Sequence, residues 1–223
     1  MKFTDGRSAW RWRVAKSKYK LLVGAKLKVG FTGDSWTEKR AIPQMMANIL
    51  YSEYSKAGEG WINFASANGD TLNGMSFNIS GWTTYDASET TAEPTYGCAL
   101  DGLCLYATGT AAGSRSTRST PPLSIYFKDT AGVFRYTIDD GTPVVVTGAG
   151  TGNVTKVDVT GLSSTGTHQL VIDLTGNTDT VVIYGVYASI SSNGVEIQNL
   201  VTRTSRLTVT QRSSVISATL PNS

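Results

Sequence analysis

Ser35 lies in the segment VGFTGDSWTE, in which an apolar run ends in Gly-Asp-Ser and a helix-like segment follows. A serine hydroxyl becomes an effective nucleophile when a base takes its proton and hydrogen-bond donors stabilise the resulting oxyanion. A turn between a strand and a helix would expose the Ser35 oxygen and place backbone N–H groups beside it. Asp and Ser are also favoured helix caps, so two interpretations stay open, a nucleophile or a cap.

The base that such a serine requires is not evident in the sequence. His168 is the single histidine, and it lies in a segment of alternating apolar and polar residues, which favours a structural role in a strand. Cys98 and Cys104 flank a predicted hairpin turn at Asp101-Gly102, with no histidine or further cysteine nearby. We therefore expect free, partly buried thiols, and we predict no metal site and no cofactor.

Aromatic residues form a second group with a chemistry of its own. Flat rings bind the faces of sugars through apolar CH contacts, and polar neighbours fix the sugar hydroxyls. The candidates are Trp61, Trp82, Tyr85, Tyr96 and Tyr126. Aromatic side chains of a folded domain mostly lie in its core, so a packing role stays open for each of them.

One strand–turn–helix unit must position Ser35. Residues 27–31 read as a short buried strand, and apolar residues then recur at helical spacing over residues 42–55, with Pro43 in the first turn. Residues 7–20 predict a short basic helix that precedes this unit.

From Trp61 onward the sequence predicts short strands separated by turn signals such as Asn-Gly and Asp-Gly. The expected strands are residues 75–85, 96–107, 122–128, 132–138, 143–147, 154–159, 168–174, 180–189 and 194–200. We expect a polar loop at residues 110–121. The predicted fold class is mainly β, a jelly-roll-like antiparallel β-sandwich with a small N-terminal α/β segment.

The net charge of +3 conceals an uneven distribution. Residues 1–40 carry 11 basic and 3 acidic side chains, and this basic block indicates a solvated helix or a contact with an acidic partner. The whole chain is too weakly charged to predict nucleic-acid binding. No apolar run is long enough to span a membrane, and the N-terminus does not resemble a signal peptide, so we expect synthesis in the cytoplasm.

The block TGDSWTE after the strand VGF resembles the first block of the SGNH (GDSL-type) esterases and acetylhydrolases. The preceding segment GRSAWRWRVAKSKYKLL is similar to the one that leads into that block. The likeness is closest to the subgroup found in bacteriophage tail-fibre and tail-spike proteins, in which a β-sandwich is inserted soon after the GDS block. FRYTIDDGTPVVVTGAG and the run that ends in YGVYAS resemble this insert.

This resemblance implies three parts. A partial SGNH-like α/β segment would span residues 1–60, and a carbohydrate-binding-like sandwich would span 61–190. A return strand and an atypical tail rich in Ser, Thr and Arg would occupy 191–223. Ser35 would be the acyl-accepting nucleophile, and Asp34 would order the turn.

The same resemblance shows what the chain lacks. The family uses a Gly and an Asn as further oxyanion donors and a base from a late Asp-x-x-His block, but the sequence has neither Gly-x-Asn-Asp nor Asp-x-x-His. Asn153 and Asn193 are better explained by turns. Either the chain is a natural derivative that keeps its sandwich for binding, or residues from about 201 onward replace the original end, for instance after a change of reading frame.

The function predicted first is a virion-associated protein of the tail-fibre or tail-spike type, made in the host cytoplasm, which binds a cell-surface or capsular glycan through its sandwich. One alternative is an active carbohydrate O-acetyl esterase, in which a partner chain supplies the base for Ser35. Another is a purely structural component that contacts other virion proteins or further copies of itself, a trimer among the arrangements.

Overall fold

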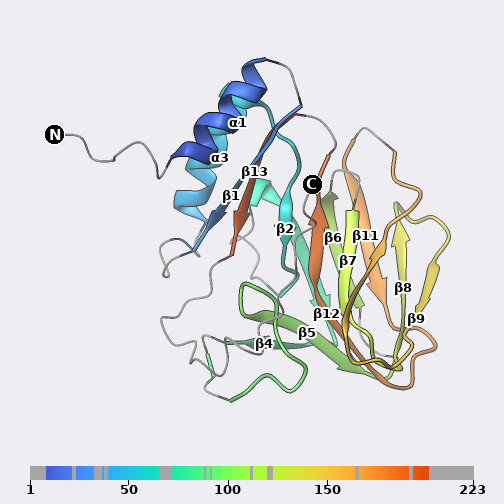
Figure 1. Ribbon diagram of the computed structural model, residues 1–223. Coiled ribbons are helices and arrows are strands. Elements are labelled where there is room, and N and C mark those ends of the chain that lie inside the picture. Colours follow the sequence, from blue (N-terminus) through green and yellow to red (C-terminus); the bar gives the residue numbers. More distant parts are fainter. Residues whose placement is uncertain are drawn as a thin grey trace.

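A computed structural model gives the structure of residues 9–21, 24–32, 37, 40–65, 72–87, 89–90, 92–110, 113–119, 123–163, 166–190 and 193–200. These residues form a β-sandwich with a smaller α/β unit beside it (Figure 1). None of the helices within these ranges is long and apolar enough to cross a membrane.

The α/β unit is built from two distant parts of the chain. It consists of α1 (Trp10–Lys20), β1 (Lys26–Phe31), α3 (Ala41–Tyr54) and β13 (Gly194–Asn199). β1 and β13 pair in parallel, with Lys26 opposite Gly194 and Phe31 opposite Asn199. Parallel strands require a long connection, and here the whole sandwich lies between them in sequence. The predicted basic helix, the strand at 27–31 and the helix at 42–55 are confirmed.

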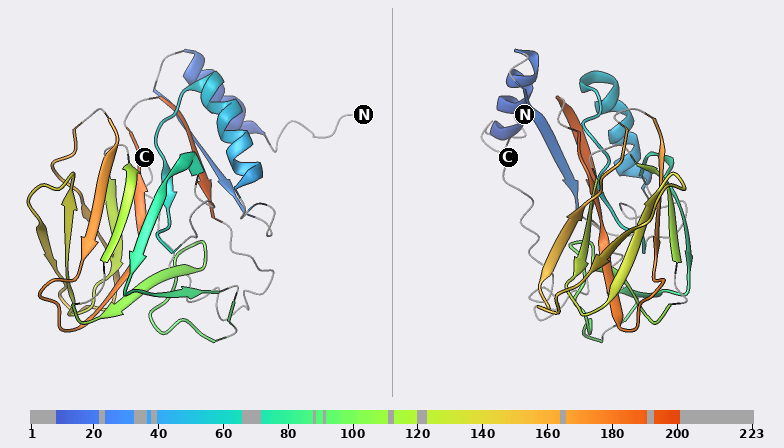
Figure 2. Two further views of the ribbon diagram at one scale, coloured as in Figure 1. Left: turned by 180° about the vertical axis from the view of Figure 1, so that it is seen from behind. Right: turned by 90° about the vertical axis from the view of Figure 1, so that its right-hand side faces the viewer.

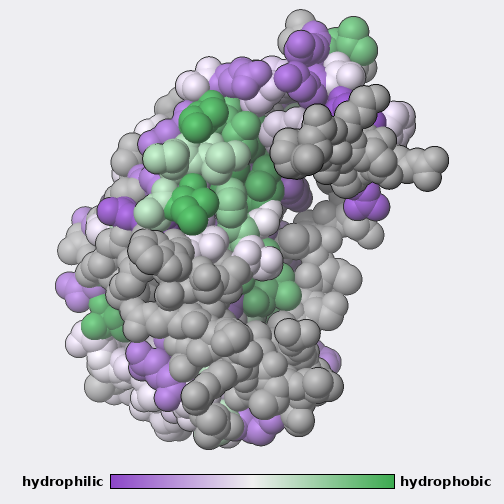
Figure 3. All heavy atoms as spheres, turned by 90° about the vertical axis from the view of Figure 1, so that its left-hand side faces the viewer, coloured by the Kyte–Doolittle hydropathy of each residue, from purple (hydrophilic) through white to green (hydrophobic). Residues whose placement is uncertain are grey.

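Helix α3 is apolar on two sides, one that packs against the protein and one that faces solvent. Its buried residues Leu50 and Tyr54 pack in one cluster with Val195 and Ile197 of β13. The opposite side carries Ile42, Met45, Met46 and Ile49, with exposed fractions from 37% to 66%. Figure 3 shows a hydrophobic, green area on the side of the molecule on which Figure 1 draws α3. A surface helix usually turns a polar side to water, so this face departs from the ordinary pattern.

Two antiparallel sheets form the sandwich, as Figure 2 shows from two sides. The first sheet has the order β10-β7-β12-β5-β4, and β2 also pairs with β12. Its strands are β10 (Val154–Asp158), β7 (Leu123–Lys128), β12 (Thr180–Ala188), β5 (Leu103–Thr108), β4 (Thr83–Asp86) and β2 (Gly60–Ile62). The second sheet has the order β3 (Ser76–Ser80), β6 (Gly113–Ser119), β11 (His168–Asp173), β8 (Val133–Ile138) and β9 (Val144–Thr147).

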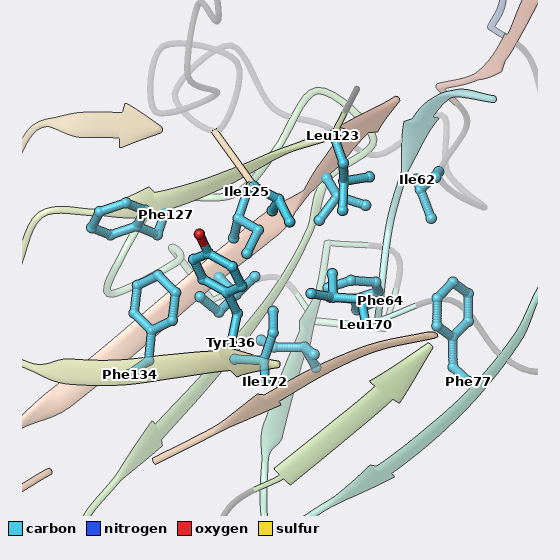
Figure 4. Close-up of a cluster of buried hydrophobic side chains, with 14 of the residues drawn as sticks. Ile62, Phe64, Phe77, Leu123, Ile125, Phe127, Phe134, Tyr136, Leu170 and Ile172 are labelled. Carbon is cyan, nitrogen blue, oxygen red and sulfur yellow. The ribbon is translucent and has the colours of Figure 1, made fainter. Parts of the chain in front are cut away.

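The main hydrophobic core lies between the two sheets. Strands β7 and β11 alternate between buried and half-buried residues, because successive side chains of a strand point to opposite faces. Ile125 and Phe127 of β7 thus meet Leu170 and Ile172 of β11 in one cluster (Figure 4). The predicted fold class, a mainly β antiparallel sandwich with a small α/β segment, is confirmed.

Several local predictions require correction. The polar loop predicted at 110–121 is wrong, because residues 113–119 form β6, which pairs with β3 on one side and β11 on the other. Backbone hydrogen bonds to two neighbours stabilise a strand that has no apolar alternation. The run predicted at 75–85 is divided at Gly81, whose φ is 74°, and within 96–107 the strand β5 begins only at Leu103.

Candidate ligand-binding groove

Ser35 and Asp34 lie outside the described residues, so their predicted roles stay predictions. The flanking elements are described: β1 ends at Phe31, and α3 begins at Ala41. The N-cap residue of α3 is Arg40, and the capping interpretation of Ser35 therefore does not apply to this helix.

His168 is buried at the start of β11. Its Nδ1 lies 2.6 Å from Oδ2 of Asp139, and Asp139 Oδ1 accepts a hydrogen bond of 2.8 Å from the N–H of Gln169. Its Nε2 lies 3.3 Å from Oγ and 3.2 Å from the carbonyl oxygen of Ser163. Because a carboxylate oxygen accepts hydrogen bonds, the contact with Asp139 places a proton on Nδ1. These contacts support the structural role that the sequence favours.

The structure brings four of the five candidate aromatic residues to the outer face of the first sheet. Trp61, Tyr85, Tyr96 and Tyr126 belong to one cluster there. Tyr85 Oη donates to the carbonyl oxygen of Ala92 at 2.9 Å, and the carbonyl oxygen of Tyr96 accepts from Tyr184 Oη at 2.6 Å. These two hydrogen bonds hold the segment before β5 against the sheet.

Trp82 does not join this cluster, because it packs against the core of the sandwich. Its Nε1 is buried and has no hydrogen-bond partner among the described residues. Cys98 and Cys104 are free, as expected, and they are fully buried where partial burial was expected. Burial raises the pKa of Cys98 to about 11 and that of Cys104 to about 12, so both remain unreactive thiols at neutral pH.

A groove of about 950 Å³ lies between the α/β unit and the first sheet of the sandwich. Helix α1 and strand β1 form one side of it, and β7 and β10 form the other. Tyr187 of β12 and Ser189 and Asn193, which follow it, also line the groove. In the right-hand view of Figure 2, α1 and β1 stand to one side of the sandwich.

Helix α1 is held by α3 and leaves another side to the groove. Its Trp12 and Tyr19 rings contact Tyr54 of α3, with centroid distances of 6.2 and 5.4 Å. Trp10 and Lys18 recur at helical spacing on the side that lines the groove. Trp10 has an exposed fraction of 63%, which is high for a tryptophan.

A buried hydrogen-bond network fixes one end of the groove. Glu196 is fully buried, and its Oε2 accepts a hydrogen bond of 2.6 Å from Tyr187 Oη. Its Oε1 contacts Ser189 Oγ and lies 3.7 Å from Nζ of Lys26, which itself donates to Ser189 Oγ at 2.7 Å. Burial raises the pKa of Tyr187, so its hydroxyl remains a donor. A buried carboxylate that is paired in this way holds its neighbours in one arrangement.

The opposite wall carries a second polar group beside an aromatic ring. Asp158 Oδ1 accepts hydrogen bonds from Lys156 Nζ at 2.8 Å and from Ser124 Oγ at 2.6 Å. Both bonds lower the pKa of Asp158, so this carboxylate is ionised at neutral pH. The Tyr126 ring lies edge-on to Trp61 at a centroid distance of 5.6 Å, which fixes its orientation.

Trp61 is in turn fixed by a buried carboxylate. Its Nε1 donates to Asp101 Oδ2 at 2.8 Å, and Asn63 Nδ2 donates to the same oxygen at 2.7 Å. Because Trp61 is 9% exposed and its N–H is already bonded, it supports Tyr126 and offers little surface to a ligand.

Three polar atoms in the groove have no hydrogen-bond partner among the described residues: Tyr126 Oη, Asp158 Oδ2 and Asn193 Nδ2. Asn193 is oriented by its Oδ1, which accepts from the N–H of Ala25 at 2.7 Å. The groove therefore presents an acceptor, an amide donor and a hydroxyl beside an aromatic ring, and each is held by a neighbour.

Sequence reasoning predicted Tyr126 but missed Lys28, Lys156, Asp158 and Tyr187 as lining residues. The basic N-terminal block was the available signal, since it indicated a contact with an acidic partner. Only the parallel pairing of β1 with β13 places this block beside β12. The two strands are separated by more than a hundred residues, and no local sequence pattern predicts that they pair.

No protein-family model and no curated protein matches the chain. Among solved structures, a two-domain esterase active on acetylated mannans is similar, with 11% identity, a TM-score of 0.40, and coverage of 62% of this chain and 38% of that one. TmCBM61 in complex with β-1,4-galactotriose shares 9% identity with a TM-score of 0.35, over 52% of this chain and 88% of that one.

An exo-β-1,3-galactanase from Phanerochaete chrysosporium with β-1,3-galactotriose shares 14% identity with a TM-score of 0.35, and the match covers 55% of this chain and 32% of that one. This chain thus spans about a third of the length of the galactanase and somewhat more of the esterase. All three TM-scores lie below 0.5, so these similarities do not assign a function to the chain.

Proposed function

We propose that the chain is a glycan-binding protein and that the groove between α1 and the sandwich is its binding site. The observation that carries this proposal is that the groove is lined by the Tyr126 ring and by three polar atoms without hydrogen-bond partners among the described residues: Tyr126 Oη, Asp158 Oδ2 and Asn193 Nδ2. A sugar ring has an apolar CH face and hydroxyl groups at its edge. An aromatic ring flanked by a carboxylate and an amide complements both.

The wider setting of this function rests on the sequence resemblance alone. In this proposal the chain is a virion-associated protein of the tail-fibre or tail-spike type, and its α/β unit is an incomplete SGNH esterase segment. The proposed division into residues 1–60, 61–190 and 191–223 belongs to the same interpretation.

Tyr126→Ala tests the groove directly. In a titration of the purified chain with glycans identified on an oligosaccharide array, we expect this variant to bind about 10-fold more weakly, since an aromatic platform dominates such sites. Tyr85→Ala is the matched control, because it removes an aromatic ring from the same face of the sheet outside the groove. Equal binding by wild type and Tyr126→Ala, or a loss confined to Tyr85→Ala, would contradict the groove as the site.

A structural role in an assembly is the second candidate, and the exposed side of α3 favours it. Ile42, Met45, Met46 and Ile49 expose a contiguous apolar stripe, and such stripes mark protein contacts. We propose a second copy of the chain as the occupant, in line with the oligomer expected of a tail-fibre-like protein.

A further inference from the structure

The groove is lined by more cations than carboxylates. The five cations are Arg11 and Lys18 of α1, Lys26 and Lys28 of β1, and Lys156 of β10. Asp158 is the acidic residue that lines it. A concave, partly enclosed surface with charges of one sign concentrates the electrostatic potential at its centre.

Two of the five cations are matched by carboxylates of the chain itself. Lys26 lies 3.7 Å from the buried Glu196, and Lys156 lies 2.8 Å from Asp158. Arg11, Lys18 and Lys28 have no carboxylate partner within the described part of the chain. The Nζ of Lys28 lies 5.5 Å from the centre of the Tyr187 ring, a contact that positions the ammonium group without neutralising it.

The other side of α1 behaves differently. There Lys16 lies 4.0 Å from Glu53 of α3 and 5.8 Å from the centre of the Tyr54 ring. Glu53 of α3 therefore pairs with a cation on the packed side of α1, while Arg11 and Lys18 line the groove, together with Lys28, without such a partner among the described residues.

We infer that the ligand of the groove is an acidic saccharide, whose carboxylate, sulfate or phosphate group is bound by Arg11, Lys18 and Lys28. This inference rests on the proposed glycan-binding function and specifies its ligand class. Tyr126, Asp158 and Asn193 contact the sugar ring and its hydroxyls, and the three cations contact its anionic group.

A nucleic acid fits the same groove less well. Asp158 is ionised, and its Oδ2 has no hydrogen-bond partner among the described residues. This carboxylate repels a backbone with a phosphate at each nucleotide but accepts a hydrogen bond from a sugar hydroxyl. A saccharide with one anionic group meets this condition.

The experiment compares charged and uncharged forms of the same sugars. The purified full chain is titrated calorimetrically with a neutral oligosaccharide that carries one terminal galacturonate, and with its methyl-esterified, uncharged counterpart. Oligosaccharides with a single sialate, sulfate or phosphate group distinguish among the acidic groups, and a single-stranded oligonucleotide tests the nucleic-acid alternative. We expect at least one acidic saccharide to bind about 10-fold more tightly than its uncharged counterpart, and this preference to shrink from about 50 to about 300 mM NaCl.

Charge-matched variants then locate the anionic group. We expect Arg11→Gln/Lys18→Gln to remove most of the preference for the acidic form, while Arg13→Gln/Lys20→Gln, which removes the same charge from α1 outside the groove lining, leaves it unchanged. Equal affinity for charged and uncharged sugars, or an equal effect of the two double variants, would overturn the inference and leave the glycan-binding proposal intact. Tighter binding of the oligonucleotide would also overturn it. Failure of every saccharide to bind would remove the proposed function itself.

Discussion

Asp101 is a buried carboxylate that holds Trp61 and Asn63 beneath the aromatic face of the first sheet. Burial raises its pKa from 3.8 to about 6 in the folded chain. Between these two values the folded state binds more protons than the unfolded state, so this residue makes the free energy of unfolding increase as pH falls from about 7 to about 4. The expected contribution is on the order of 2–3 kcal/mol.

Urea unfolding of wild type and Asp101→Asn at several pH values measures this contribution. Asp129, Asp139 and Asp173 have lowered pKa values and change stability in the opposite direction, but they are common to both proteins and cancel in the difference. We expect wild type to gain stability relative to Asp101→Asn as pH falls through about 6. A difference that is constant with pH would show that Asp101 is not perturbed.

Ser35 permits a prediction about catalysis. If the chain lacks the base of an SGNH esterase, as proposed, it should hydrolyse 4-nitrophenyl acetate no faster than Ser35→Ala, because a serine without its base loses orders of magnitude in rate. His168→Ala tests whether the single histidine of the sequence contributes to any hydrolysis. Hydrolysis that depends on Ser35 would contradict the incomplete-esterase proposal and favour the alternative of an active O-acetyl esterase.

At the scale of elements, strands with apolar alternation could be predicted from the sequence, and others could not. β7, β8 and β11 follow the predicted runs closely, because their inward side chains build the core. β12 also follows its predicted run, but it is an apolar strand that is buried on both faces. β6 could not be predicted, since its stability comes from backbone pairing with β3 and β11. The helix at 42–55 was predicted from apolar periodicity, but the periodicity alone does not show which of its apolar residues face solvent.

The exposed stripe of α3 makes a prediction about association. We expect the wild-type chain to self-associate at concentrations of about 10–100 µM, as measured by light scattering after size exclusion, and Met45→Glu/Ile49→Glu to remain monomeric, because burying two carboxylates in an apolar interface is costly. Val144→Glu/Val145→Glu, at an exposed apolar pair on β9, is the matched control. A monomeric wild type, or association lost only in the control, would contradict the α3 interface.

At the scale of the whole molecule, the groove exists because distant segments meet. Lys26 is 163 positions from Ser189, its hydrogen-bond partner, and Ala25 is 168 positions from Asn193. The sequence indicated a basic N-terminal block and an aromatic sandwich separately. Their apposition follows from the parallel pairing of β1 with β13, so the candidate aromatic Tyr126 could be predicted, whereas the cations and Asp158 that accompany it could not.

The most direct test of the glycan-binding groove is an NMR titration of the ¹⁵N-labelled full chain with an acidic oligosaccharide. We predict that the largest amide shift changes cluster at Tyr126, Lys156, Asp158 and Tyr187, with further changes in α1, and that the second sheet is unaffected. Shift changes concentrated on the second sheet or around Tyr85 and Tyr96, or none at saturating sugar, would contradict the groove as the binding site.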